Sequence, residues 1–116
     1  MVLNPYVVLS PDWLAKAVEF MDSHPKYGAI GGKTKRYQYS NDDLKEVQES
    51  GIIDSTGFLM RRSRYCTDRG AGEQDTGQFD QAEDIFGISG SCLFLRRAGL
   101  VEIRYGEESL DADVFA

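Results

Sequence analysis

Apolar residues recur at helical spacing in residues 11–23, which is the most regular pattern in the chain. Ser10 suits the N-cap, Pro11 suits the first helical position, and Pro25 stops a helix. The predicted apolar face consists of Trp13, Leu14, Ala17, Val18, Phe20 and Met21. We therefore expect an amphipathic helix over residues 11–23 that packs on one face of a small mixed sheet.

Two extended segments flank this helix. Around the Asn4-Pro5-Tyr6 turn, the short apolar runs Val2–Leu3 and 7–9 predict a strand that the turn interrupts or ends. Residues 27–39 are also expected to be extended, because exposed and half-buried residue types alternate in their second half. The Gly31-Gly32 pair within them indicates a bulge or a close approach of another backbone.

A hairpin is predicted in the middle of the chain. Residues 52–61 form a second extended run, and residues 63–68 are suited to pair with it as the other arm. One side of the first arm would carry Ile53, Ser55, Gly57 and Leu59. Ahead of it, the pattern of residues 44–49 leaves both a short helix and an irregular excursion open.

The most apolar stretch, residues 84–95, predicts a buried strand that is broken at Ser89-Gly90-Ser91. A glycine between two hydroxyls in such a strand has two explanations: a β-bulge, or a place where a ligand approaches the backbone closely. The polar, glycine-rich residues 70–81 precede this stretch, and loops of that length are usually functional or mobile. A short helix is expected to begin at Arg96.

Composition and charge narrow the class of protein. The chain has 116 residues, 41% of them hydrophobic and 28% charged, which is typical of one soluble α/β domain. No apolar run approaches the ~20 residues of a membrane helix, and no secretory leader is recognisable. Thirteen Lys+Arg against nineteen Asp+Glu give a net charge of −6, which argues against a nucleic-acid-binding protein. We expect a cytoplasmic protein without a transmembrane segment.

Cysteine and histidine are scarce, and this excludes several kinds of site. Cys66 and Cys92 are the only two cysteines, so a disulfide-dense scaffold and a four-cysteine zinc site are excluded. Two reduced thiols are expected, with a single disulfide as the alternative. His24 is the only histidine and precedes Pro25, so we interpret it as a helix-terminus residue near the negative end of the dipole. Triads and metal sites built on histidines are thereby excluded.

Two charged segments are candidates for chemistry. The basic segment contains the residue types that recognise phosphate groups, although a solvated pair of strands explains it equally simply. It consists of Arg61, Arg62, Arg64, Tyr65 and Arg69. In the acidic tail, Asp111 and Asp113 are spaced so that they could share a hard cation such as Mg²⁺, but an acidic surface tail is the commoner arrangement.

Taken in order along the chain, several short motifs resemble the family 2 glycosyltransferases, notably their rhamnosyltransferase-like branch. Residues 3–14 are similar to the family's segment LNPD-V-x-L-x-P-x-x-L, and residues 24–33 to its strand P-x-x-G-A-x-G-x-K. Residues 86–97 are similar to V-S-G-A-x-x-L-x-R-R. The middle of the family's pattern is matched by residues 53–57 and 69–73, and F-D-E-D-F-F-A by residues 110–116. The resemblance therefore covers nearly the whole chain in the right order.

The resemblance implies a GT-A fold, of which residues 1–116 would be a partial domain. This domain would be the central and acceptor-side segment, without the nucleotide-binding half that precedes it and the catalytic-base segment that follows. The parent enzymes transfer sugar from a nucleotide-diphosphate sugar to an acceptor hydroxyl, with Mg²⁺ or Mn²⁺ as the cofactor. We expect this chain alone to be inactive, with no catalytic residue, no cofactor, and weak or no binding of nucleotide sugar.

The resemblance also indicates where a substrate would bind. Ser89, Gly90 and Ser91 would lie at the floor of the sugar and acceptor site, and Asn4 and Tyr6 belong to the segment that holds the metal in the family. Tyr6 stands where the family has its metal-binding Asp, and a phenol with an ordinary pKa of about 10 is a poor substitute for a carboxylate. No metal site is therefore expected, with Asp111 and Asp113 as the remaining candidates.

A second hypothesis belongs to a different class of protein. The chain could be a non-catalytic binding or assembly module that reuses half of the fold. Half of a doubly wound sheet exposes strand edges and an apolar face, which a symmetric partner would cover. This hypothesis predicts a homo-oligomer with Tyr6, Val7 and Val8 in the contact.

Overall fold

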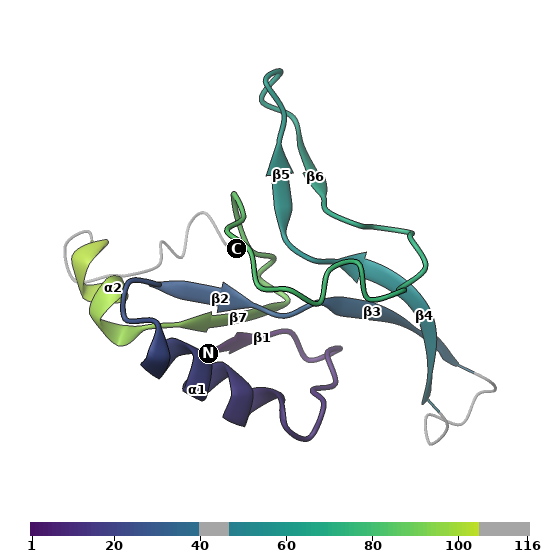
Figure 1. The fold of residues 1–116 in the computed structure, drawn as a ribbon, viewed down its shortest axis with the longest axis horizontal. Helices are drawn as coiled ribbons and strands as arrows, with labels where there is room; N and C mark the ends of the chain where they lie inside the picture. The colour runs from purple at the N-terminus through teal and green to yellow at the C-terminus, as the bar shows by residue number, and fades with distance from the viewer. Residues whose placement is uncertain (40–46, 105–116) are drawn as a thin grey trace. The chain divides into compact units, whose positions relative to one another are not determined.

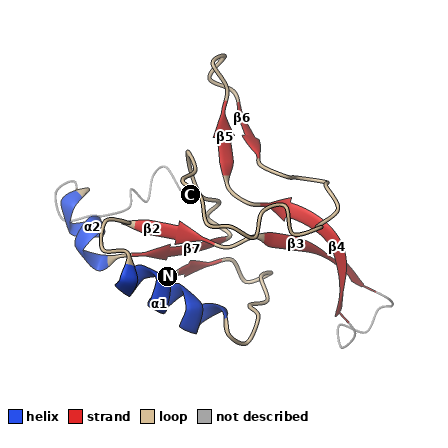
Figure 2. Cartoon of the chain, in the orientation of Figure 1, coloured by secondary structure: helices blue, strands red, loops and turns tan. Residues whose placement is uncertain are grey.

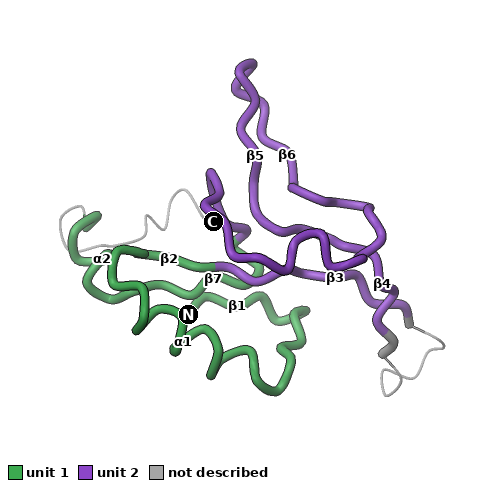
Figure 3. The backbone as a smooth tube through the Cα atoms, in the orientation of Figure 1, with its two compact units in different colours: residues 1–30, 90–116 green, residues 31–89 purple. Residues whose placement is uncertain are grey.

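The computed structural model describes residues 1–39 and 47–104, which form short strands and two helices (Figures 1 and 2). In chain order the elements are β1 (Val2–Leu3), α1 (Trp13–Ser23), β2 (Ala29–Gly31), β3 (Thr34–Tyr39), β4 (Val47–Ser55), β5 (Phe58–Met60), β6 (Cys66–Asp68), β7 (Cys92–Leu95) and α2 (Arg97–Glu102). They divide into two compact units: unit 1 comprises residues 1–30 and 90–116, and unit 2 comprises residues 31–89 (Figure 3). These small sheets and two helices confirm the predicted α/β class.

Unit 1 is built on a three-stranded sheet in the order β1-β7-β2. The first strand runs antiparallel to β7, with Val2 opposite Leu93 and Leu3 opposite Cys92. Helix α1 packs against this sheet, because Trp13 meets Phe94 edge-on with 6.3 Å between ring centroids. The buried residues of this unit are Ala17, Met21 and Cys92. Residues 1–30 and the described residues from 90 onward therefore share one small core.

Helix α1 confirms the predicted helix but begins two residues later than expected. Its N-cap is Asp12 rather than Ser10, and no side-chain hydrogen bond caps it. Asp12 instead forms an i,i+4 ion pair with Lys16 at 2.5 Å. The buried face is also narrower than the predicted one, since Leu14 and Val18 are 47% and 42% exposed.

The C-terminus of α1 confirms the interpretation of His24, which is its C-cap residue. The His24 ring stacks on Phe20 with 4.2 Å between centroids, and its Nδ1 lies 2.9 Å from the Phe20 carbonyl oxygen. Arg96, the residue before α2, reaches the same helix end. Its guanidinium donates to the Met21 carbonyl and, at 3.0 Å, to the Tyr27 carbonyl.

Unit 2 contains two antiparallel strand pairs, β3–β4 and β5–β6. The predicted hairpin is confirmed, but the extended run over residues 52–61 turns at Thr56-Gly57 and contributes to two different pairs. Gly57 permits this turn because its φ is +111°, in a region that favours glycine. The side predicted to carry Ile53, Ser55 and Gly57 is buried, whereas Leu59 on the same predicted side is 47% exposed.

The structure settles one strand prediction, and several others were wrong. Of the two alternatives for the first strand, the turn at Asn4 ends it after Leu3, so residues 7–9 do not continue it. Of residues 84–95 only Cys92–Leu95 forms a strand, and Ser89-Gly90-Ser91 leads into it instead of bulging within it. Residues 47–49 belong to β4, so they are neither a helix nor an irregular excursion, and residues 44–46 lie outside the described part. The described strands form three small sheets instead of one.

Candidate functional site

The structure brings together two of the predicted site segments, which are 87 positions apart in the sequence. The main-chain N–H of Asn4 donates a 2.8 Å hydrogen bond to the carbonyl oxygen of Ser91. This bond continues the antiparallel β1–β7 ladder by one step beyond Leu3. Asn4 and Ser91 therefore lie side by side, directly after the end of β1 and directly before the start of β7.

Asn4 organises the turn that follows β1. Its side-chain oxygen accepts the N–H of Tyr6 at 3.0 Å, and its carbonyl oxygen accepts the N–H of Val7 at 3.0 Å. This arrangement is an Asx turn, in which the Asn side chain accepts a main-chain N–H from two residues further along the chain. Such a bond takes the place of the hydrogen bond that a continuing strand would make. The side-chain oxygen of Asn4 is thus committed to the turn, and its amide N–H₂ is the group it can offer to a ligand.

Tyr6 and Gly90 are both open to solvent. The Tyr6 residue is 85% exposed. A Cβ atom added at Gly90 would meet no atom within 4 Å, and Gly90 does not adopt the positive φ that favours glycine. The fold itself therefore does not require glycine at this position. Asn4, Tyr6, Gly90 and Ser91 all belong to unit 1, whereas Ser89 belongs to unit 2.

The described residues do not fit a divalent metal. Hard cations take six or more oxygen ligands, carboxylates foremost. Residues 1–39 and 47–104 contain no group of three or more His, Cys, Asp and Glu that could hold one. Tyr6 offers an exposed phenol. The alternative metal candidates, Asp111 and Asp113, lie outside the described residues.

A second cluster, in unit 2, was not predicted from the sequence. The Lys33 ammonium lies 2.7 Å from Asp75 and 2.5 Å from Asp80, and the Lys35 ammonium lies 3.0 Å from Asp75 and 3.5 Å from Glu49. Hydrogen bonds from Lys33 and Lys35 hold the pKa of the Asp75 carboxyl well below its usual range. Burial opposes the charge of Lys33, but its bonds to Asp75 and Asp80 outweigh this and raise its pKa.

The cluster fixes the glycine-rich loop that the sequence predicted to be functional or mobile. Between residues 70 and 75 the loop runs along β4, where Ile53 donates to the Glu73 carbonyl and Gly72 donates to the Ile53 carbonyl, both at 2.9 Å. The Asp75 N–H also donates to the Gly51 carbonyl at 2.8 Å. These bonds cover an edge of β4 that would otherwise be open to another strand. Ile53, with 0% exposure, is the centre of this small core.

The basic segment separates into two parts. Arg69 belongs to the interior of unit 2: it contacts Glu83 at 2.5 Å, and its guanidinium carbon lies 4.4 Å from the centroid of the Phe79 ring. Arg61, Arg62 and Arg64 lie at the exposed turn between β5 and β6. Phosphate recognition by the whole segment is therefore not supported, because Arg69 is already paired.

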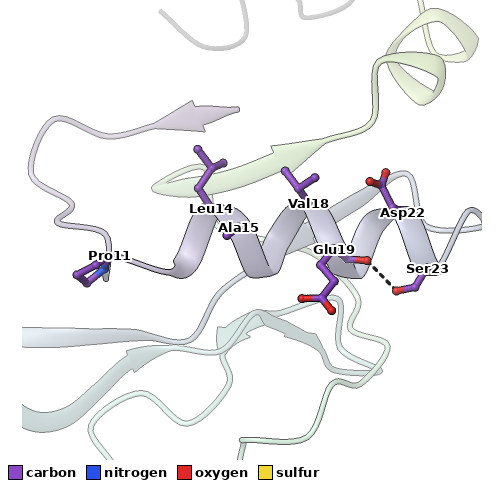
Figure 4. A pocket seen from close by; sticks show the side chains of 7 residues that line it. All are labelled: Pro11, Leu14, Ala15, Val18, Glu19, Asp22 and Ser23. Carbon is purple, nitrogen blue, oxygen red and sulfur yellow. Dashed lines mark hydrogen bonds between the residues drawn. The ribbon is translucent and has the colours of Figure 1, made fainter.

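The outer face of α1 carries a shallow apolar strip. It is lined by Pro11, Leu14, Ala15, Val18, Glu19, Asp22 and Ser23. Figure 4 shows Leu14 and Val18 projecting from the same side of the helix, with the Ser23 hydroxyl turned back to donate to the Glu19 carbonyl at 2.8 Å. The strip is open to solvent and mostly apolar, so it does not enclose a small molecule as a ligand pocket does.

The two thiols are free, as predicted: Cys66 is exposed and Cys92 is buried. Burial raises the pKa of the Cys92 thiol. In β6, the Cys66 sulfur lies 3.7 Å from the Met60 sulfur across the hairpin. The raised pKa of Cys92 opposes its use as a nucleophile, since a depressed pKa is what makes a thiol reactive.

Comparisons of the chain with protein-family models, with curated proteins and with solved structures find no match in any of the three. In the described ranges 1–39 and 47–104, no helix has the length and apolar character needed to cross a bilayer.

Proposed function

We propose that this chain is a section of a sugar-transferring enzyme of the family 2 glycosyltransferase type, with a partial GT-A fold, and that it contributes the acceptor-side floor without the catalytic groups. The motif order along the sequence is the basis of the proposal. The observation that carries it is the hydrogen bond between the Asn4 N–H and the Ser91 carbonyl. Two motifs from opposite ends of the chain meet there, as residues of one binding site must.

The groups at this junction suit a hydroxyl-bearing ligand. The Asn4 amide N–H₂ is a donor, and Asn4 and Gly90 are both exposed. Gly90 adds no side chain there, so a ligand would reach the backbone without a clash. These groups can bind and orient an acceptor hydroxyl. They cannot remove its proton, because the carboxylate base that this step needs is not among them.

The proposal is tested by titrating the ¹⁵N-labelled chain with neutral mono- and disaccharides and following the amide resonances. We expect the resonances of Asn4, Gly90 and Ser91 to shift, with a Kd of roughly millimolar, which corresponds to about −4 kcal/mol. Labelled nucleotide-diphosphate sugars with Mg²⁺ should show no turnover. Micromolar binding of a nucleotide sugar, or saccharide-induced shifts confined to unit 2, would contradict the proposal.

One substitution isolates the ligand-binding group from the structural one. Asn4→Asp keeps a side-chain oxygen that can accept the Tyr6 N–H, and it removes the amide donor. We expect saccharide binding to be lost while the unperturbed spectrum stays close to that of the wild type. Ser10→Ala, at an exposed serine of unit 1 outside the junction, is the matched control and should bind as the wild type does.

Self-association is the second candidate function, and the β1 edge favours it. This strand pairs only with β7 in the described sheet, and its two residues, Val2 and Leu3, are each 38% exposed. An exposed apolar edge is a template for a second strand. Sedimentation velocity at tens of micromolar tests this candidate, with Val2→Lys as the variant that should dissociate an edge-to-edge dimer. A monomer of wild-type chain at that concentration would exclude it.

A further inference from the structure

The tip of the β5–β6 hairpin has a composition that the proposed function does not use. Arg61, Arg62, Arg64 and Tyr65 are all exposed, and Tyr65 is 67% exposed. The two residues before them, Leu59 and Met60, are also exposed, by 47% and 42%. Figure 1 shows the hairpin extending away from the β3–β4 pair within unit 2, so the tip stands clear of that pair.

The register of the hairpin places apolar and cationic groups on the same face. Leu59 lies opposite Thr67, and Met60 lies opposite Cys66. The Arg61 N–H donates to the Tyr65 carbonyl at 3.0 Å, which continues the ladder by one pair. Because alternate residues of a strand share a face, Leu59 and Arg61 lie on one face together with Tyr65. Met60 lies on the other.

The tip arginines differ from most basic residues of unit 2, because none of the three has an ion-pair partner among the described residues. Lys33, Lys35, Arg36 and Arg69 each contact a carboxylate. At the tip, three guanidinium groups lie within four consecutive positions of a chain whose net charge is −6. Such a local excess of positive charge attracts the tip to a negatively charged surface.

The backbone at the tip adds an independent observation. Arg64 closes the turn by donating its N–H to the Arg61 carbonyl at 2.8 Å, and its φ is +63°. A three-residue hairpin loop usually has glycine at this left-handed position, because other residues are strained there. The chain thus carries an arginine where a glycine would make a more stable turn. Strain of this kind is commonly found where a side chain serves a function.

We propose that the β5–β6 hairpin tip docks end-on against an anionic lipid surface, with its arginines on the headgroup phosphates, and with Leu59 and Tyr65 of one face and Met60 of the other entering the interface. Arginine suits phosphate through its planar fork of donors, and tyrosine suits the boundary between headgroups and acyl chains. Leucine and methionine add apolar area to be buried there, whereas on a nucleic acid their side chains could neither hydrogen-bond to a base nor stack on one as an aromatic ring does. The aliphatic residues therefore favour a lipid surface over a nucleic acid.

The test is co-sedimentation of the full chain with phospholipid vesicles. We expect binding to vesicles of phosphatidylcholine with phosphatidylglycerol, little binding to pure phosphatidylcholine, and loss of binding as salt is raised. Arg62→Gln with Arg64→Gln should weaken the partition by ~25-fold, at about fivefold for each arginine near the surface. Arg97→Gln with Arg104→Gln removes the same charge from unit 1 and is the matched control. Equal weakening by both double variants would overturn the proposal, since net charge alone would then explain it.

Two further measurements separate docking from structural effects. Arg64→Gly should make the turn more stable while weakening vesicle binding by ~5-fold, a combination that a merely structural role cannot give. Leu59→Ser should weaken binding without altering its dependence on salt. A single-stranded oligonucleotide serves as the competing ligand: if it binds more tightly than the anionic vesicles and Arg62→Gln with Arg64→Gln removes that binding, the tip is a nucleic-acid site and the lipid proposal fails.

Discussion

The guanidinium group of Arg96 donates a hydrogen bond to the main-chain carbonyl of Met21, 75 positions earlier in the chain. The same carbonyl accepts the main-chain N–H of His24 at 3.3 Å, and a cation placed at the last carbonyl groups of a helix favours the helix dipole. Arg96 also donates from its side chain to Tyr27 and from its main chain to Gly28. It therefore fastens the end of α1 to the beginning of α2 within unit 1.

Replacing Arg96 with Ala should destabilise unit 1 by about 2 kcal/mol, because charge-assisted hydrogen bonds to partly buried carbonyls are removed. Trp13 is the only tryptophan of the chain and packs on β7, so its fluorescence in a denaturant titration reports on this unit. Arg97→Ala, at the adjacent exposed position, should stay within about 0.5 kcal/mol of the wild type. Equal losses for the two variants would show that the Arg96 bonds carry no stability.

The stability of unit 2 should fall in acid because of Asp75. Its pKa is lowered in the folded state, so its ion pairs stabilise unit 2 above the ordinary pKa of about 4 and are lost as pH falls below that value. The lysines act at the opposite end: raised pKa values of Lys33 and Lys35 mean that their contribution is present below about pH 10 and is lost at higher pH. The plateau of stability should therefore lie between these limits.

Hydrogen exchange of the Ile53 amide, which donates to Glu73 beside this cluster, is the measurement that reports on unit 2. Protection should decrease between pH 5 and 2.5 more steeply in the wild type than in Asp75→Asn, after correction for intrinsic exchange. Asp68→Asn, at an exposed carboxylate of β6, should retain the wild-type slope. The expectation fails if Asp75→Asn and the wild type respond to acid in the same way.

Gly57 is a position where any side chain should be costly. A Cβ atom there would clash with Ile85 Cδ1 and would lie 3.1 Å from the Gly87 carbonyl oxygen, and the φ of +111° is strained for other residues. We expect Gly57→Ala to lower the free energy of unfolding of unit 2 by about 2 kcal/mol or more. Gly90→Ala is the control, since its Cβ would meet nothing within 4 Å, and it should be nearly neutral. Thermal unfolding followed by circular dichroism distinguishes the two.

The two cysteines should react at very different rates with an aromatic disulfide reagent. Cys66 is exposed and should be modified in the folded chain, whereas Cys92 is buried with a raised pKa and should react only on unfolding. Cys66→Ser should therefore abolish labelling under native conditions. Detection of a disulfide between them by mass spectrometry of the unreduced chain would contradict the free-thiol arrangement.

The sequence alone determined those elements whose hydrogen-bond partners lie only a few residues apart in the chain. Helix α1 was predictable because its apolar spacing and flanking prolines act within a few residues, and His24 marked its end for the same reason. The β5–β6 hairpin was predictable because its two arms are separated by a short turn. The apolar composition of residues 84–91 was misleading, since a local pattern does not reveal whether a backbone partner exists. Only Gly87 of this segment forms a bridge, to Phe58.

The contacts that define the candidate sites were decided by tertiary structure. Asn4 was singled out from sequence and so was Ser91, but their adjacency depends on β1 pairing with β7 across almost the whole chain. The pairing of Lys33 with Asp75 and the capping of Met21 by Arg96 had no signal in the sequence. Charged residues are common on surfaces, and their spacing along a chain carries no information about which of them meet. The physical reason is that helices and hairpins are held by bonds within a few residues, whereas a site is assembled from groups that only the folded backbone brings within hydrogen-bond distance.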